Sequence, residues 1–327
     1  MKNFFYICLS ILLLFFFNCS NQNSKPKKLT IQILDTNVTD HSFNRLVEIL
    51  NERFYQLEIE DIKIQRTSSN TFQMESVELL DKDDDIIQII LKKGFVEFKL
   101  IPEKEYVINV MNKVDSVLRN WIASNYEENF EDESSLDVYQ QLDLKDKEFK
   151  REHPFFSIAL LDPQFRSADA FVREQERDSL ENFLKLSEIQ KIIPEELQFT
   201  FSAISQVDNE GNKFEMMYVV YKHSELSGDI IIDATASIDP SSEAPVINFT
   251  LNSYAADQWS NITAENIHKR IAILIDGLVY IAPVVRARIP SGRCQIEGAE
   301  NIDDARAIAT ILKSGTLPHS LTVIKDE

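Results

Sequence analysis

The chain has 327 residues and a formal net charge of −19, from 34 lysine and arginine and 53 aspartate and glutamate residues. A surface this acidic argues against a nucleic-acid partner, because binding to DNA or RNA depends on basic side chains that contact phosphates. Only seven glycines are present, which also argues against a glycine-rich loop for nucleotide phosphates. The length suits two modest domains with cores of their own.

Residues 1–18 are predicted to be a signal peptide. Lys2 precedes an apolar run from Phe4 to Phe17, which is shorter than the ~20 residues of a membrane-spanning helix. The run leads into Cys19 and resembles the signals of bacterial lipoproteins, in which this cysteine carries the lipid, including palmitate, and starts the mature chain. We therefore expect a lipid anchor at Cys19 and a polar tether over residues 19–28. An ordinary or uncleaved secretory signal is the alternative.

Residues 29–101 read as a β-α-β-β-β segment. Apolar residues alternate over 29–33, which predicts a strand, and recur at helical spacing over 42–57, with Asp40 as the expected N-cap. Three further strands are predicted, at residues 59–64, 86–91 and 95–101. A sheet with helices on one face is the simplest way to bury these apolar residues.

Residues 102–223 begin with a predicted helix over 103–126, whose apolar residues form a near-heptad stripe. We expect this helix to pack on its own domain, with a lever or partner-binding helix as the alternative. The acidic and mixed-charge stretch at 127–152 predicts a loop. The remaining predictions are a strand at 155–161, a helix at 170–191, and a hairpin of 197–207 and 214–221 around a turn at 208–212.

Residues 270–318 contain a second hairpin signal. Asp276-Gly277 stands between two apolar runs, and this pair favours a tight turn because both central residues need positive φ. Gly292 and Gly298 flank a third short strand. A segment of helical period then ends at Gly315, with Pro318 just beyond, which is the expected stop of a helix.

The same stretch resembles the head of the first periplasmic domain of SecD, an accessory subunit of bacterial protein export. That family reads roughly A-I-x-L-D-G-x-V-x-x-A-P, then I-x-x-G-x-x-x-I-x-G, then a helix ending in S/A-G-x-L-P. The matching positions include Asp276, Gly277, Ala282, Pro283, Gly292, Gly298, Gly315 and Pro318. The resemblance is strong over 224–320 and fainter over 28–101, where Gly94 to Leu100 resembles a family strand. It implies an α+β fold with a ferredoxin-like base over 29–101, a helical and hairpin insertion over 102–223, and a SecD-type head over 224–320.

Sites for catalysis, metals or cofactors are not indicated. The five histidines, His41, His153, His223, His268 and His319, include no pair at the helical spacing of a zinc site. The acidic cluster at 81–85 lacks the glycine and glutamate of a calcium loop, and Asp276 is explained by turn geometry alone. Cys294 is expected to be a buried structural thiol. We therefore expect no enzyme activity, no metal and no cofactor.

The resemblance implies a non-enzymatic envelope protein that assists protein export. SecD proper continues into a membrane bundle, whereas this sequence stops at Glu327, so we expect a stand-alone lipoprotein facing the periplasm. Its expected partners are unfolded or translocating polypeptide and components of the Sec translocon, with the membrane contacted through the lipid. The alternative is a binding or scaffold lipoprotein that uses the head fold for another envelope partner.

Overall fold

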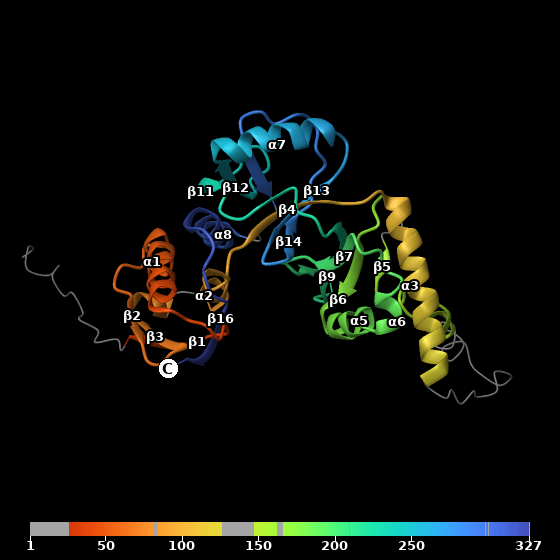
Figure 1. The fold of residues 1–327 in the computed structure, drawn as a ribbon, viewed down its shortest axis with the longest axis horizontal. Helices are drawn as coiled ribbons and strands as arrows, with labels where there is room; N and C mark the ends of the chain where they lie inside the picture. The colour runs from red at the N-terminus through yellow and green to blue at the C-terminus, as the bar shows by residue number, and fades with distance from the viewer. Residues whose placement is uncertain are drawn as a thin grey trace, which may run out of the picture.

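The computed structural model describes residues 26–81, 84–125, 147–161, 166–208, 210–297, 299 and 301–326. The predicted signal peptide, Cys19 and Gly298 lie outside the described residues, as does most of the predicted loop at 127–152. Three parts follow one another across Figure 1: a base at one side, a head in the middle and an insertion at the other side. Each part combines antiparallel strands with helices, so the predicted α+β class is confirmed.

The base is a four-stranded antiparallel sheet with the order β16-β1-β3-β2. In chain order its elements are β1 (Lys27–Ile33), α1 (Asp40–Gln56), β2 (Lys63–Arg66), β3 (Thr71–Ser76), the 3-10 turn η1 (Glu78–Asp81), α2 (Asp84–Ile90) and β16 (Leu321–Asp326). A β-α-β-β-α-β succession with the strand order 4-1-3-2 is the ferredoxin-like arrangement, so the ferredoxin-like base is confirmed. Its last strand comes from the other end of the sequence, after all of the head.

Three predictions for this region need correction, and one strand was missed. The apolar run at 86–91 forms helix α2 rather than a strand, because a short apolar run has no period that separates the two. Strand β3 was not predicted, and the expected tether extends less far because Lys27 and Lys28 already belong to β1. Thr39, not Asp40, caps α1: its hydroxyl accepts a hydrogen bond from the Ser42 amide in a capping box.

The head contains two sheets. The first has the order β10-β4-β13-β14, from β4 (Val96–Leu100), β10 (Leu226–Ser227), β13 (Ile271–Ile275) and β14 (Leu278–Ile281). The second has the order β11-β12-β15, from β11 (Ile231–Ile238), β12 (Pro245–Leu251) and β15 (Arg293–Glu297), and packs against α7 (Ser253–Glu265) and α8 (Ile302–Ser314). The strand predicted at 95–101 therefore forms as β4, but in the head rather than the base. Phe98 and Trp259 meet in the head core with ring centroids 5.0 Å apart.

The hairpin predicted at Asp276-Gly277 is confirmed. Ile275 pairs with Leu278 across the turn, and β13 and β14 are antiparallel. Asp276 has φ 53° and Gly277 has φ 81°, which are the two positive values that a type I′ turn requires.

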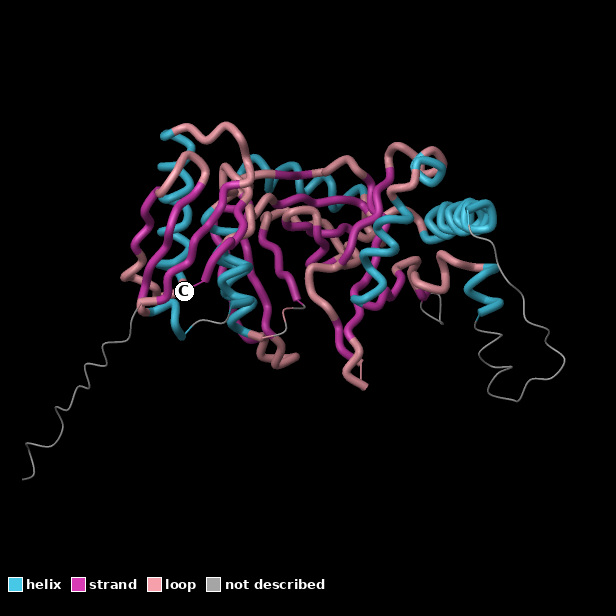
Figure 2. The backbone as a smooth tube through the Cα atoms, turned by 90° about the horizontal axis from the view of Figure 1, so that it is seen from below, coloured by secondary structure: helices cyan, strands magenta, loops and turns pink. Residues whose placement is uncertain are grey.

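The insertion is a sheet with the order β5-β6-β9-β7, covered by helices. Its elements are α3 (Lys104–Asn125), β5 (Leu160–Leu161), β6 (Ala170–Arg173), the 3-10 turn η3 (Glu174–Glu176), α5 (Arg177–Leu184), α6 (Ser187–Gln190), β7 (Leu197–Phe201), β8 (Gln206–Val207) and β9 (Lys213–Tyr221). The predicted hairpin of 197–207 and 214–221 is confirmed as β7 and β8 against β9. Figure 2 shows the base strands side by side at one end of the molecule and α3, seen along its axis, at the other.

The predicted long helix is confirmed as α3, and its buried face contributes to the core of the insertion. Two other predictions there are wrong. The strand predicted at 155–161 is only Leu160–Leu161, preceded by a turn. The helix predicted at 170–191 begins as strand β6, because Ala170 to Arg173 pair with β9, a tertiary contact that local pattern does not show. Residues 147–152 are helical rather than part of a loop.

Helices in the described part of the chain are all too short or too polar to cross a membrane. In the same residues, no group of three or more histidine, cysteine or acidic side chains is arranged to hold a metal ion.

Candidate functional site at the junction of base and head

The base and the head are joined by two short chain crossings. One leads from α2 to β4 through residues 91–95, and the other leads from α8 to β16 through residues 315–320 (Figure 1). The two crossings are hydrogen-bonded to each other, because the Leu317 amide donates to the Lys93 carbonyl at 2.7 Å. The apolar cores of base and head are separate clusters, but α8 of the head also packs against α1 and α2, and Ile89 of α2 lies against the head core. The junction and this helix packing together hold the two parts.

Asp276 reaches from the β13–β14 turn into the first crossing. Its carboxylate accepts hydrogen bonds from the amides of Gly94, at 3.0 Å, and Phe95, at 2.8 Å, and its own amide donates to the Phe95 carbonyl at 2.9 Å. The interpretation that turn geometry alone explains this aspartate is therefore wrong. The residue shapes the hairpin and also fixes the chain that enters the head.

Arg53, on α1 of the base, occupies the centre of the junction and is fully buried. All five of its N–H groups have acceptors, which a buried guanidinium requires. The acceptors are the carbonyls of Ile90 and Lys92, both at 2.6 Å, Lys93 at 3.2 Å and Gly315 at 2.8 Å, and Ser314 Oγ at 2.9 Å. One side chain thus binds the end of α2, the first crossing and the end of α8.

Burial lowers the pKa of Arg53 to about 10, and the Asp276 carboxylate opposes that shift. The guanidinium is therefore still charged at neutral pH, and its charge is shared among backbone carbonyls and one nearby carboxylate. The polar contacts at this junction depend on one another, because Asp276 and Arg53 hold the same short segment from two sides.

Glycine is required where these contacts are tightest. Gly94 has φ 81°, and a Cβ atom there would lie 2.6 Å from Ile311 Cγ2 and 2.8 Å from Arg53 Nη2. Gly315 ends α8 with φ 82°, as expected for a helix stop. Next to it, Asp229 accepts hydrogen bonds from the Thr316 amide at 3.0 Å and hydroxyl at 2.8 Å.

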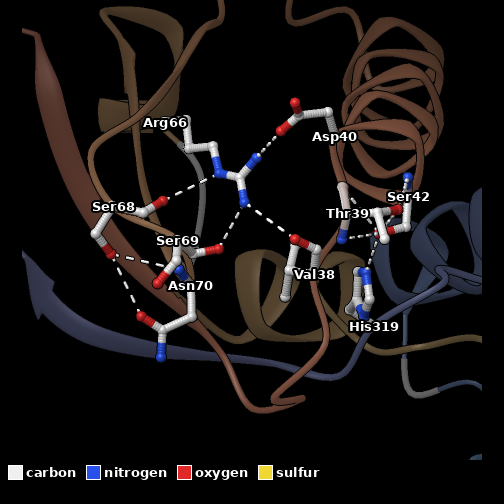
Figure 3. A network of polar contacts seen from close by, with 9 residues as sticks. All are labelled: Val38, Thr39, Asp40, Ser42, Arg66, Ser68, Ser69, Asn70 and His319. Carbon is white, nitrogen blue, oxygen red and sulfur yellow. Dashed lines mark hydrogen bonds and ion pairs between the residues drawn. The ribbon is translucent and has the colours of Figure 1, made fainter.

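A second polar cluster ties the end of the other crossing to α1. His319 Nε2 lies 2.7 Å from Ser42 Oγ (Figure 3). His319 Nδ1 lies 3.2 Å from Asp35 Oδ2. The Ser320 amide lowers the pKa of Asp35, and His319 adds to this effect. Arg66 lies in the same region and joins Asp40, at 2.7 Å, to the β2–β3 turn.

The Asp35–His319–Ser42 connectivity is that of a nucleophilic serine, yet its other contacts belong to a helix cap. Ser42 Oγ accepts from the Thr39 amide at 3.1 Å and donates to the Thr39 carbonyl at 3.0 Å. The His319 side chain is only 8% exposed. These contacts account for the cluster as a structural link between α1 and the strand that completes the base.

The motif residues of the sequence fall into two groups. Asp276, Gly277, Gly315 and Pro318 come together around the junction. The others serve the head itself: the carbonyls of Ala282 and Pro283 accept from Arg270 Nε and the Ile271 amide, both at 3.1 Å, and Gly292 packs against Ala256 of α7. Cys294 is half-buried rather than buried as predicted, and desolvation raises the pKa of its thiol to about 12.

Arg53 was missed by the sequence analysis. It is one of several charged residues along an amphipathic helix, and charged residues at such positions are normally solvated. The only signal is its spacing: Arg53 follows Ile49 and Leu50 and precedes Phe54, and this places it on the buried face of α1.

Comparison with known proteins agrees with this architecture. Residues 202–319 match the family model described as SecDF, P1 head subdomain. The protein translocase subunit SecD of Rhodothermus marinus is 37% identical over 145 residues, covering 44% of this chain and 23% of the relative. SecDF of Thermus thermophilus is 40% identical over 98 residues, covering 30% of this chain and 13% of the relative.

One solved structure shares the overall fold. The crystal structure of SecDF in its super-membrane-facing form superposes with a TM-score of 0.52 at 21% sequence identity, covering 92% of this chain and 30% of that one. The chain thus aligns with less than a third of the length of these relatives. Within that length, residues 202–319 match the SecDF P1 head subdomain, and the described residues share the fold of the SecDF structure.

Proposed function

We propose that this chain is a non-enzymatic accessory of protein translocation that binds translocating polypeptide outside the inner membrane. The observation that supports this most is the match of residues 202–319 to the SecDF P1 head, in relatives named as translocase subunits. In this proposal the chain binds polypeptide, and the junction of base and head acts as its hinge. Its expected partners are Sec translocon components and unfolded polypeptide.

The junction suggests how such a domain responds to a bound chain. The base and head are held by the hydrogen bonds of Arg53 and Asp276 and by the packing of α8 on α1 and α2. Each hydrogen bond to the buried guanidinium is worth ~1.5–3 kcal/mol, which is comparable to the free energy that a bound polypeptide can supply. The angle between base and head is therefore set by a small, discrete group of contacts that a partner on the head can shift.

Binding of unfolded polypeptide is the first expected result. A fluorescently labelled, permanently unfolded protein should bind the detergent-solubilised full chain with a dissociation constant at or below tens of micromolar, about −6 kcal/mol. The measurement is a fluorescence anisotropy titration, and the control is the labelled native protein from which the permanently unfolded form is prepared. Equal binding of the folded and unfolded forms, or none, would count against polypeptide capture.

Crosslinking in cells distinguishes export from the scaffold alternative. A photoreactive amino acid at exposed Tyr254 of the head should capture nascent chains or Sec components. Capture of unrelated envelope proteins only would favour a scaffold that uses the same fold for another partner.

The lipid anchor at Cys19 is part of the same proposal. Cys19→Ala should release the protein from the membrane fraction into the soluble envelope fraction, because one cysteine thiol is the expected site of acylation. The measurement is membrane fractionation with mass spectrometry of the mature N-terminus, and Cys294→Ala is the matched control. A mature N-terminus at another residue would contradict the anchor.

A further inference from the structure

Strand β7 lies at an open edge of the insertion sheet. Its five residues pair with β9, from Leu197 opposite Tyr221 to Phe201 opposite Met217. Within the described ranges, the sheet order ends at β7, and no described strand lies beside the second side of β7 along most of its length. Open edges are normally protected in native proteins because their free N–H and C=O groups pair with other chains.

The direction of the free backbone groups follows from the register. The Lys222 amide donates to the Glu196 carbonyl, and the Ser202 amide donates to the Met216 carbonyl, both at 2.7 Å. In an antiparallel pair, bonded residues alternate with residues whose groups face the other side. Gln198 and Thr200 therefore bond to β9, and the N–H and C=O of Phe199 face outward. Among the residues that the structure describes, no hydrogen bond to these two groups is found.

A groove of about 550 Å³ runs along this edge. Residues from both faces of β7 line the groove, together with residues of α5 and α6 and the first residue of β14. Because both faces of β7 contribute, the groove lies along the edge of the strand and not over one face of the sheet. Its principal lining residues are Leu184, Ile193, Gln198, Phe199, Lys222 and Leu278. Its volume is within the ~300–1,000 Å³ typical of binding clefts.

The lining of the groove is partly apolar and partly polar. Leu184, Ile193 and Leu278 belong to the same apolar cluster as the half-buried Phe199, whereas Gln198 and Lys222 add polar groups to the lining. The charged groups of the helix side largely neutralise one another. Arg177 pairs with Glu181 at 3.1 Å and with Glu215 at 2.6 Å, and Lys185 pairs with Glu181 at 3.3 Å. The groove is thus nearly neutral in a chain of net charge −19.

We propose that an extended polypeptide segment binds in this groove by adding an antiparallel strand to β7. This rests on the proposed function and specifies its binding site. The N–H and C=O groups of an added strand would bond to the free C=O and N–H groups of Phe199. Because these bonds involve only the main chain, guests of many sequences can bind. Directly opposed residues place their side chains on the same face. The guest residue opposite Phe199 is therefore apolar and meets Leu184 and Ile193, and its two neighbours are polar.

The length of the guest is limited at one end. β14 closes the groove there, because Ser202 forms a parallel bridge with Val279 and the Ala203 amide donates to the Val279 carbonyl at 2.8 Å. The remaining edge holds about five residues, or about 17 Å at 3.4 Å per residue. Thr200 also donates a hydrogen bond to the carbonyl of Gly277. Strand β7, which borders the guest site, is therefore hydrogen-bonded to the β13–β14 turn, and Asp276 of that turn holds the junction.

The test uses a labelled seven-residue peptide in which valine and threonine alternate, titrated against the full chain by anisotropy. N-methylation of every valine removes the guest N–H that would bond to Phe199 and should weaken binding at least tenfold. N-methylation of every threonine alters N–H groups that face away and should change binding less than threefold. The protein is unaltered in this comparison.

Two protein variants give an independent test. Phe199→Pro removes the N–H that faces the groove and leaves the β7–β9 ladder intact, because proline is tolerated where an edge N–H faces outward. It should weaken binding of the parent peptide at least tenfold, whereas Phe199→Leu, which keeps the N–H, should cost less than threefold.

Equal binding of the two N-methylated peptides would overturn strand addition to β7. If the unfolded protein still binds in that case, the proposed function stands and only its location at β7 is wrong. If neither the unfolded protein nor the parent peptide binds, the proposed function fails as well.

Discussion

Arg53→Met is expected to lower the free energy of unfolding by about 3–5 kcal/mol. The substitution leaves four carbonyls and a hydroxyl in the junction without their donor, and an unsatisfied buried polar group costs ~1–3 kcal/mol. Water can reach some of these groups when the junction loosens, so the individual costs do not simply add. The measurement is urea unfolding followed by circular dichroism.

Arg45→Met is the matched control for this prediction. Arg45 lies on the same helix and pairs with Glu48 at 3.2 Å, but both side chains are exposed, so the change should be within ~0.5 kcal/mol. Hydrogen exchange gives a local readout: in Arg53→Met, exchange at the Leu317 amide should accelerate more than exchange in the core of the head. Equal stability of the two variants would show that the guanidinium does not hold the junction.

Gly292→Ala is expected to destabilise the head by about 2–4 kcal/mol. Gly292 has φ 62°, and a Cβ atom there would lie 2.5 Å from Ala256 Cβ and 3.1 Å from Ala256 Cα. The left-handed conformation costs an L-residue ~1–2 kcal/mol, and overpacking against a helix backbone adds ~1–3 kcal/mol because α7 cannot move aside locally. Thermal or urea unfolding measures the sum.

Gly211→Ala separates the two contributions. Gly211 also has positive φ, 86°, but a Cβ atom there meets no other atom within 4 Å. It should therefore show the conformational cost alone, ~1–2 kcal/mol. If both alanine variants lose the same stability, close packing of β15 on α7 is not the reason for glycine at 292.

Local patterns predicted well those elements that local interactions determine. The Asp276-Gly277 turn, α3 and the β7–β9 hairpin each depend on residues close in sequence, and each forms as expected. The run at 86–91 could not be assigned, because four isoleucines and a leucine in six positions satisfy a strand and a helix equally. The segment at 170–173 is a strand only because β9 lies beside it.

The candidate site could be predicted in part. The resemblance indicated Asp276 and Gly315 as motif residues, and both lie at the junction. It gave no indication that Asp276 binds the amides of Gly94 and Phe95 or that Arg53 joins them, because those contacts link residues about 180 to 260 positions apart. Pairings over such distances depend on the three-dimensional arrangement and leave no periodic signal in the sequence.

The split base also fixes an order of folding. Residues 94–316 are continuous and contain every strand of the head and the insertion, whereas β1 and β16 meet only after the whole chain is available. Closing a loop of this length in an unfolded chain costs ~5 kcal/mol by the logarithmic rule. A folded head already holds Lys93 and Leu317 within a hydrogen bond, which removes most of that cost. A folded head therefore brings the segments before and after it together, so that β1 can pair with β16. We expect the base to be the last part to become resistant to proteolysis during synthesis.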